Sequence, residues 1–497
     1  MIRIGHVIDR LRAMPEHSVQ CVVTSPPYYG LRDYGLEPVI WAPVQFSPMP
    51  GMTEWLLPAH ANPVRFTECD HEWDAWGESH DVRETATKGK TRTTDRSYVG
   101  DATRRFDGNH QKHAHGQTCR KCGAWRGCLG LEPDPNLYIG HLVQVFREVR
   151  RVLRKDGTLW LNLGDSYANG GRKTRDADDK LTARGMGSRP GDPAGIKPKD
   201  LMGIPWRAAF ALQADGWWLR SDIVWEKPNA MPESVTDRPT RSHEMVFLLT
   251  PSDRYFYDHV AIREPHTAES VARIGRGRAA RHKWTNGPGG QTITQDLSRA
   301  WHPMGRNKRD VWTVSTKPYK GAHFAVFPPD LVEPMIRAGT SEAGACPHYG
   351  KPWARITERV TGNAPDSYNG SSFHRGKTMR AQESLSAVGT APRTTAMRTT
   401  GWKPECACPK HDPVPCVVLD PFGGSGTTAM AAQALCRRWE IIEANPHYAP
   451  LAENRLLITA KNGTKATRTA RRQTPNSSQL NLINDMEILD GEHPAHR

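Results

Sequence analysis

Long hydrophobic stretches are absent from this chain of 497 residues, of which only 37% are hydrophobic. No uninterrupted apolar run approaches the ~20 residues that a membrane-spanning helix needs. The N-terminus also lacks the apolar core of a secretory leader. These absences argue against a membrane or secreted protein, and we expect a cytoplasmic one.

An excess of acidic residues is lacking as well. Lysine and arginine number 67 against 53 acidic residues, which gives a net charge of +14. A soluble protein with this balance favours a polyanionic partner such as nucleic acid. A generally basic proteome would produce the same excess, so the charge favours nucleic acid without identifying it.

Cysteine is not scarce, and ten cysteines in a cytoplasmic chain indicate metal ligands or free thiols rather than disulfides. Two close pairs supply four N/S ligands of the kind that hold a structural zinc ion: Cys69, His71, Cys119 and Cys122. The polar segment between the pairs could not hold itself together by burial, and a zinc ion would supply that restraint. His115 and Cys128 are spare alternatives, and four unconnected reduced residues are the other interpretation.

A second, weaker zinc set comprises Cys346, His348, Cys406 and Cys408. The first segment of this set has one cysteine, Cys346, and Tyr349 stands where the second cysteine of a C-x2-C pair would be. Either His348 or His411 would therefore have to complete a tetrahedral site.

Two short segments at opposite ends of the chain are the most informative. Thr24-Ser25-Pro26-Pro27-Tyr28 follows the apolar run 19–23, and Asp420-Pro421-Phe422-Gly423-Gly424-Ser425-Gly426 follows the run 416–419. Such runs are typical of buried strands in a mostly parallel sheet, and α/β folds bind ligands in the loops that leave these strands. The first loop suits a planar group and the second a nucleotide-like cofactor.

This pair of motifs resembles the DNA amino-methyltransferases, which methylate an exocyclic base nitrogen with S-adenosylmethionine. The order, with the catalytic tetrapeptide first and the glycine loop last, is similar to the β group of that family. The resemblance also covers 142–167, 219–258, 322–344 and 438–451, somewhat under half of the chain. It implies an α/β fold with a Rossmann-like sheet that is circularly permuted in sequence, a double-stranded DNA substrate, and a bacterial or phage-encoded enzyme.

The resemblance implies that Ser25, Pro26, Pro27 and Tyr28 form the catalytic loop. The Ser25 hydroxyl and the Pro26 carbonyl oxygen would accept hydrogen bonds from the target amine and draw its lone pair out of conjugation. The Pro-Pro step stiffens the loop, and Tyr28 offers a face on which a flipped base can stack. Family members with Ser at the first position mostly act on N4 of cytosine and those with Asp on N6 of adenine. We therefore expect N4-methylcytosine, with adenine N6 as the alternative; for the loop alone, an ordinary Pro-Pro turn is another.

The resemblance implies a larger cofactor-binding set: Thr24, Asp165, Asp420, Pro421, Phe422, Gly423, Gly424, Ser425, Gly426, Thr427, Glu443 and Asn445. A helix that begins at Thr427 would offer free N–H groups to the methionine carboxylate. Glu443, at the end of a predicted strand 438–443, is placed to accept both ribose hydroxyls. For Asp165 a simple helix cap explains the residue nearly as well. Many relatives have Gly-Asp where this chain has Gly5-His6, which puts the contribution of that Asp in doubt.

A basic stretch lies where the β group places its target-recognition segment, and its candidate DNA contacts are Arg273, Arg276, Arg278, Arg281, Arg306, Lys308 and Arg309. These cations would neutralise phosphates, and arginine can also read guanine edges. The alternative is a solvated basic loop.

The chain is thus divided into catalytic segments 1–40, 131–258, 321–345 and 412–461, insertions 41–130 and 346–411, a target-recognition segment 259–320 and a flexible basic tail 462–497. The second insertion includes a Ser/Thr/Arg-rich stretch that we expect to be disordered. Within 131–258, apolar residues at helical spacing predict a helix over 138–154 that Gly157 ends.

We therefore predict a site-specific DNA methyltransferase. The alternative from another functional class is a catalytically inactive, zinc-containing DNA-binding protein. The sequence leaves open the recognition site, a homodimer, and a cognate restriction endonuclease.

Overall fold

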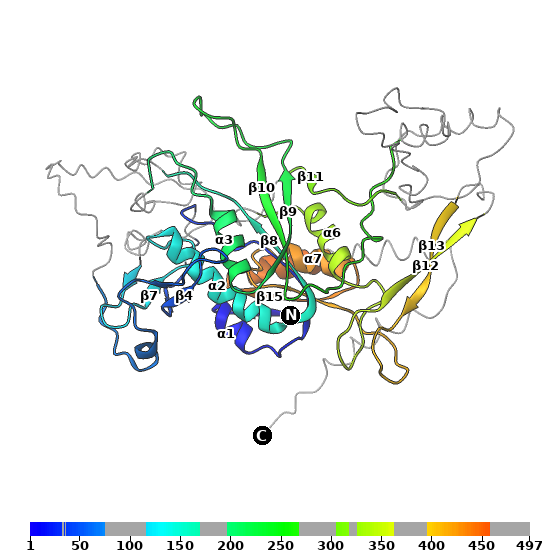
Figure 1. Cartoon of the computed structure of the whole chain (residues 1–497), viewed down its shortest axis with the longest axis horizontal. Coiled ribbons are helices and arrows are strands. Elements are labelled where there is room, and N and C mark those ends of the chain that lie inside the picture. The colour runs from blue at the N-terminus through cyan, green and yellow to red at the C-terminus, as the bar shows by residue number, and fades with distance from the viewer. Residues whose placement is uncertain are drawn as a thin grey trace, which may run out of the picture.

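A central eight-stranded sheet organises the chain (Figure 1). The computed structural model describes residues 1–31, 34, 36–74, 116–168, 196–267, 305–317, 326–361 and 395–457. In spatial order the strands are β1 (Ile2–Ile4), β15 (Arg438–Glu443), β14 (Val417–Asp420), β2 (Val19–Thr24), β8 (Leu153–Leu163), β10 (His243–Thr250), β9 (Trp218–Glu226) and β11 (Val311–Thr313).

The first five strands are parallel to their neighbours, whereas β10 runs antiparallel to both β8 and β9. The two C-terminal strands, β15 and β14, lie between β1 and β2 from the N-terminus. Register pairs Val418 with Cys21 and Leu419 with Val22, so β14 and β2 end at the same edge of the sheet. The predicted α/β fold with a mostly parallel, Rossmann-like sheet is therefore confirmed, and strands from the two ends of the chain meet in its middle.

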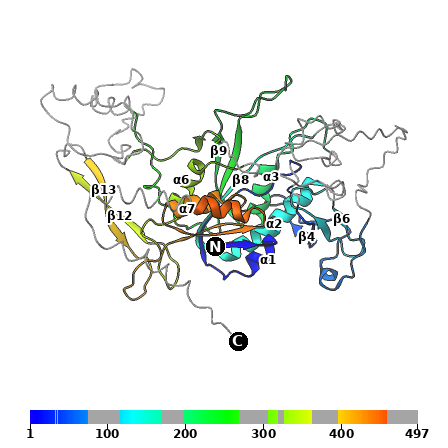
Figure 2. The same cartoon turned by 180° about the vertical axis from the view of Figure 1, so that it is seen from behind.

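Helices cover both faces of the sheet (Figure 2). One face carries α1 (Val7–Arg12), α2 (Pro135–Val152) and α3 (Ile204–Ala214), and the other carries α6 (Pro329–Gly339) and α7 (Thr427–Ala434). Successive residues of a strand point to opposite faces, so in β2 Val22 packs with the first group and Val23 with the second. This two-sided burial explains the apolar runs before both loops. Among the described helices, none combines the length and apolar character needed to cross a bilayer.

The helix predicted over 138–154 begins earlier and ends earlier than expected. The Asp134 side chain accepts a hydrogen bond from the Asn136 N–H (2.8 Å), and Pro135 occupies the first turn. Strand β8 begins at Leu153, directly after the helix, and Gly157 lies inside that strand. The expectation that Gly157 ends the helix was wrong, because the chain passes from helix to strand without the glycine turn.

The described part of the first insertion packs against α2. It contains a three-stranded sheet of β3 (Val39–Trp41), β7 (Trp125–Gly127) and β6 (Gln117–Thr118), a pair of β4 (Val44–Phe46) and β5 (Trp55–Leu57), and a 3-10 helix, Pro63–Glu68. The rings of Trp41 and Trp125 each stack on His141 of α2, with centroids 4.7 and 5.3 Å from the imidazole. The insertion thus shares the main core through these aromatic side chains.

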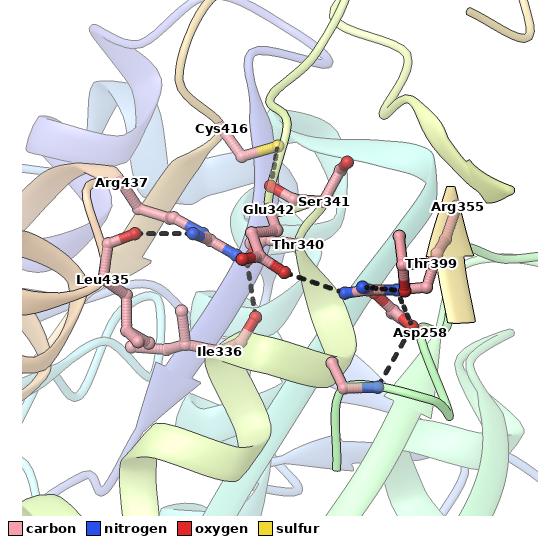
Figure 3. Close-up of polar contacts among 11 residues, drawn as sticks. Asp258, Ile336, Thr340, Ser341, Glu342, Arg355, Thr399, Cys416, Leu435 and Arg437 are labelled. Carbon is pink, nitrogen blue, oxygen red and sulfur yellow. Dashed lines mark hydrogen bonds and ion pairs between the residues drawn. The ribbon is translucent and has the colours of Figure 1, made fainter. Parts of the chain in front are cut away.

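The second insertion forms an antiparallel ribbon of β12 (Ala354–Thr361) and β13 (Thr395–Lys403), drawn in yellow at the side of Figure 1. Its attachment is polar (Figure 3): the Arg355 guanidinium donates to the Asp258 carboxylate at 2.8 Å and to Glu342 at 2.9 Å. Within the ribbon, Arg355 also donates to the Thr399 hydroxyl of β13 at 3.0 Å. Arg437 donates to the Thr340 hydroxyl (3.0 Å) on the same loop after α6. This loop is therefore held by one arginine from the ribbon and by Arg437, which directly precedes β15.

Arg355→Met is expected to lower the free energy of unfolding by roughly 3–5 kcal/mol, because it leaves the Asp258 carboxylate buried without its charged partner. Only 12% of the Arg355 side chain and 3% of Asp258 is exposed. Urea unfolding of the full chain measures the change. The matched control is Lys351→Met, whose contact with Glu405 spans 3.9 Å between half-exposed groups and should matter little. Equal losses of unfolding free energy in the two variants would contradict a stabilising role for the Arg355–Asp258 ion pair.

Candidate functional site

The buried carboxylate of Asp420 joins the two loops predicted from the sequence. The Thr24 hydroxyl, at the end of β2, donates to Asp420 Oδ1 at 2.6 Å. The Thr428 hydroxyl, in the first turn of α7, donates to Oδ2 at 2.8 Å, and the Phe422 N–H donates to Oδ1 at 3.0 Å. Adjacent parallel strands bring these groups together, so the Ser-Pro-Pro-Tyr loop and the glycine loop leave the same edge of the sheet.

Burial raises the pKa of Asp420 to about 6, even though the three hydrogen bonds from Thr24, Thr428 and Phe422 act to lower it. Desolvation of the charged form is the larger effect here.

The glycine loop between β14 and α7 has a backbone that side chains would disturb. Gly424 and Gly426 have φ values of 50° and 76°, in the left-handed region that glycine enters without steric cost. A Cβ on Gly423 would lie 2.7 Å from Cβ of Ile441. The loop can therefore pass close to a bound ligand.

Arg455 holds the end of this loop. Its Nη1 donates to the Ser425 carbonyl oxygen and to the Thr427 hydroxyl, both at 2.9 Å. Arg455 thus binds two residues of the predicted cofactor set, Ser425 and Thr427.

Glu443, at the end of β15, reaches the same loop. One carboxylate oxygen accepts the Gly424 N–H and the other the Asn445 N–H, both at 2.7 Å. Burial is the main cause that raises its pKa, to about 7. Each oxygen keeps a further lone pair, so the carboxylate can accept additional hydrogen bonds from a ligand.

Tyr28 is anchored by its hydroxyl, which donates to Glu244 Oε2 at 2.7 Å and lies 3.0 Å from Asn162 Oδ1. The Lys227 ammonium group contacts the other Glu244 oxygen. The ring packs on Gly164, where a Cβ would come within 2.5 Å of the ring edge. Burial raises the pKa of the Tyr28 hydroxyl well above its ordinary value, so the group stays a neutral donor.

Sequence reasoning missed three of these residues: Asn162, Lys227 and Glu244. Asn162 lies near the carboxyl end of β8, and Glu244 near the start of the antiparallel strand β10. Polar residues at strand ends could have pointed to Asn162 and Glu244. Placing Glu244 at the correct edge of the sheet, however, requires that the antiparallel direction of β10 is known. The register pairs Met245 with Leu163 and Val246 with Asn162, so Glu244 and Asn162 lie at the same edge of the sheet as the Tyr28 loop.

The remaining polar groups of the Ser-Pro-Pro-Tyr loop differ in whether a protein hydrogen bond already occupies them. The Ser25 hydroxyl donates toward the Tyr28 oxygen at 3.4 Å, which leaves the Ser25 lone pairs free. The Pro27 carbonyl oxygen accepts the Tyr138 hydroxyl at 2.7 Å. Within the described ranges, the Pro26 carbonyl oxygen accepts no hydrogen bond. Ser25 and Pro26 therefore offer two free acceptors side by side.

Asp165 acts as a helix cap in this structure, which was the alternative interpretation of that residue. Its Oδ1 accepts the N–H of Ile204, the first residue of α3, and the N–H of Ser166, both at 2.9 Å. The Ser166 hydroxyl donates to the Tyr29 carbonyl oxygen at 3.1 Å, so this turn also contacts the catalytic loop.

Three predicted DNA contacts surround a single carboxylate, that of Glu264. Arg306 Nε lies 2.9 Å from it, Arg309 Nε 3.4 Å and Lys308 Nζ 3.7 Å. Three positive charges against one leave a locally basic surface, on which Arg309 is the most exposed, at 64%. The other predicted contacts lie outside the described residues: Arg273, Arg276, Arg278 and Arg281.

The first set of candidate metal ligands gathers in space as a whole, and the second does so in part. In the first set all four ligand atoms lie within 4.8 Å of one another: Cys69, His71, Cys119 and Cys122. In the second set the three thiols of Cys346, Cys406 and Cys408 do so. Neither His348 nor His411 joins that group by the same distance, but His411 Nε2 lies 4.0 Å from one of its members, the Cys406 sulfur.

A family model described as DNA methylase, for the N6/N4 methyltransferases, matches residues 19–388 and 415–454. Three similar relatives are type II methyltransferases. M.XycI of Xanthomonas campestris pv. cyanopsidis is 34% identical over 91% of this chain and 86% of its own. M.Cfr9I of Citrobacter freundii is 33% identical with the same coverage, and M.SmaI of Serratia marcescens is 38% identical over 67% of this chain and 78% of its own.

Solved structures with some likeness include PvuII DNA methyltransferase (cytosine-N4-specific), with 13% identity, coverage of 92% of this chain and 85% of that one, and a TM-score of 0.38. The M1.HpyAVI–SAM complex has 13% identity, coverage of 63% and 82%, and a TM-score of 0.29.

Asp420→Asn is expected to flatten the pH dependence of stability between about pH 4 and 6. In the native state Asp420 keeps its proton up to about pH 6, whereas an unfolded Asp releases it near 3.8. The native protein therefore binds more protons in this window, and its free energy of unfolding falls as the pH rises. The expected fall from this group is about 3 kcal/mol.

Asparagine suits this position because its oxygen can still accept from Thr24, while Thr428 can donate to the Val23 carbonyl oxygen, 3.2 Å away. Urea unfolding at several pH values compares the wild type with Asp420→Asn and with Asp253→Asn, an exposed control. The same slope in all three proteins would refute the role of Asp420.

Proposed function

Because the chain belongs to the N6/N4 DNA methylase family, we propose that it transfers a methyl group from S-adenosylmethionine to N4 of a flipped cytosine in double-stranded DNA. The observation that carries the proposal is the Asp420 carboxylate, which holds the Ser-Pro-Pro-Tyr loop and the glycine loop at one edge of the sheet. The preference for cytosine N4 rests on Ser25 at the first position of the tetrapeptide. Adenine N6 is the alternative.

The glycine loop and Glu443 fit the cofactor. The left-handed glycines let the backbone approach it, and the free N–H groups where α7 begins suit the methionine carboxylate. Glu443 has lone pairs for the ribose hydroxyls. In this proposal Thr24 and Asp420 hold the loops together, and Asp165 supports the edge by capping α3. When bound, S-adenosylmethionine supplies the electrophilic methyl group.

The catalytic loop prepares the amine for attack. The Ser25 oxygen and the Pro26 carbonyl oxygen accept the two amine hydrogens, which favours a pyramidal nitrogen and draws its lone pair out of conjugation with the ring. Since the Ser25 hydroxyl hydrogen points to Tyr28, the serine acts at this step as an acceptor. After methyl transfer the nitrogen must lose a proton, and the hydrogen-bonded chain from Ser25 through Tyr28 to Glu244 offers a route for it.

The inactive DNA-binding alternative is disfavoured by the preserved loops and by the similarity to type II methyltransferases over most of the chain. Because these relatives are named type II methyltransferases, we also propose that the protein acts with a cognate restriction endonuclease. On the DNA side, we propose that the cations around Glu264 contact the phosphate backbone.

Expression of the wild type in a methylation-free host is expected to produce N4-methylcytosine in its DNA, and Ser25→Ala to abolish it. Nucleoside mass spectrometry identifies the base. Because Ser25 lies outside the glycine loop, calorimetry should find cofactor affinity in Ser25→Ala within about twofold of the wild type.

The outcomes separate the alternatives. N6-methyladenine would keep the enzyme and overturn the base assignment. No methylated base together with no cofactor binding would favour the inactive DNA-binding protein.

Arg309→Ala is expected to weaken duplex DNA binding roughly threefold to tenfold at low salt and to reduce the salt slope by about one, as for the loss of one phosphate contact. Fluorescence anisotropy over a salt series measures both quantities. Arg254→Ala, an exposed arginine in another loop, is the control, and identical slopes for the two variants would exclude a specific role for Arg309.

A further inference from the structure

We propose that Cys69, His71, Cys119 and Cys122 hold a structural zinc ion. The residues come from two segments of the first insertion, 69–71 after the 3-10 helix and 119–122 after β6. They are three thiols and an imidazole, the donor types that closed zinc sites use. The four ligand atoms lie within 4.8 Å of one another, so a single ion can contact all of them.

The separations between these atoms match the edges of a zinc tetrahedron. With Zn–S near 2.3 Å and Zn–N near 2.05 Å, tetrahedral angles require about 3.8 Å between two sulfurs and about 3.6 Å between sulfur and nitrogen. The Cys69 and Cys119 sulfurs are 3.7 Å apart, and Cys122 Sγ lies 3.4 Å from His71 Nδ1. A disulfide would need about 2.05 Å, so the sulfur pair is not poised as one.

The backbone around the second pair supports thiolate ligands. The Ala124 N–H points at the Cys122 sulfur at 3.5 Å, and the Gly123 N–H closes a turn on the Cys119 carbonyl oxygen at 2.9 Å. Such N–H groups orient a metal-bound sulfur. The apolar cover is small and consists mainly of Phe66, Trp73 and Ala124. A metal restraint would therefore add stability that burial in this module does not supply.

A series of side-chain and backbone contacts connects this site to the catalytic loop. Three residues after Cys122, Trp125 stacks on His141, whose Nδ1 lies 2.8 Å from the buried Glu132 carboxylate. The other Glu132 oxygen accepts the Gly130 N–H at 2.7 Å, and the Gly130 carbonyl oxygen accepts the Gly30 N–H at 2.8 Å. Gly30 follows Tyr28 by two residues. The zinc ion thus braces one side of the loop that, in the proposed function, holds the target base.

A separate observation identifies the fourth ligand of a second zinc site, at Cys346, Cys406 and Cys408. His411 Nδ1 lies 2.8 Å from the Pro409 carbonyl oxygen, which fixes the proton on Nδ1 and leaves the Nε2 lone pair facing the Cys406 sulfur at 4.0 Å. The Cys346 and Cys408 sulfurs are 3.6 Å apart, again close to a tetrahedral edge. We infer that His411, rather than His348, completes this site.

The experiment measures zinc per chain in the purified full-length protein by mass spectrometry, after expression in zinc-containing medium without chelators. The wild type is expected to hold about two ions. His71→Ala and His411→Ala should each lose one, whereas His60→Ala and His348→Ala should lose none. His71→Cys should keep both, since a thiolate replaces the imidazole, and it covers the case in which His71→Ala does not fold.

Wild-type protein without zinc, or His71→Ala with two ions, would overturn the first site. Loss of an ion in His348→Ala but not in His411→Ala would overturn the second assignment. Zinc content does not depend on the proposed reaction, so the sites can stand if that proposal fails. If both hold, His71→Ala should lower the rate of methyl transfer severalfold while calorimetric affinity for S-adenosylmethionine stays within about twofold. Unchanged turnover would overturn the bracing of the catalytic loop.

Discussion

The hydrogen bonds to the buried Asp420 carboxylate are the contact on which the candidate site depends. Asp420 is separated from Thr24 by almost 400 positions in sequence, yet β14 and β2 are neighbours in the sheet. One carboxylate accepts from the end of β2, from the first turn of α7 and from its own loop. Burial of this group is costly, which its raised pKa reflects, and the three donors offset that cost. The two loops therefore keep a defined relation to each other.

The Ser-Pro-Pro-Tyr loop, for which we propose the catalytic role, is supported from three directions. Asn162 and Glu244 hold the Tyr28 hydroxyl from the sheet, and Tyr138 of α2 holds the Pro27 carbonyl oxygen. From the insertion, Gly130 pairs with Gly30. Loop residues supported on several sides lose little further entropy when they align a substrate, which is what transfer to a weakly nucleophilic amine requires.

The insertions are joined to the core in different ways. The first contributes Trp41 and Trp125 to the main core, while the second is attached through the charged contacts of Arg355. In the described residues the first has a small apolar cluster of its own and the second a two-stranded ribbon, and each brings cysteines together. Small modules of this kind need a restraint other than burial, and a closed tetrahedral metal site is a common one.

The sequence by itself indicated a mostly parallel α/β sheet and the family, because strand-end motifs and apolar runs are local patterns with known geometry. It also brought out the two loops and the four residues of the first metal cluster from their spacing alone. Only the tertiary structure decided which groups meet. The directions of β10 and β9 bring Glu244 and Lys227 to the Tyr28 loop. The structure also places His411 beside the Cys406 sulfur, and Gly157 within a strand. Asp165 caps a helix that begins 39 positions later. These choices depend on contacts between distant segments, which no local pattern in the sequence encodes.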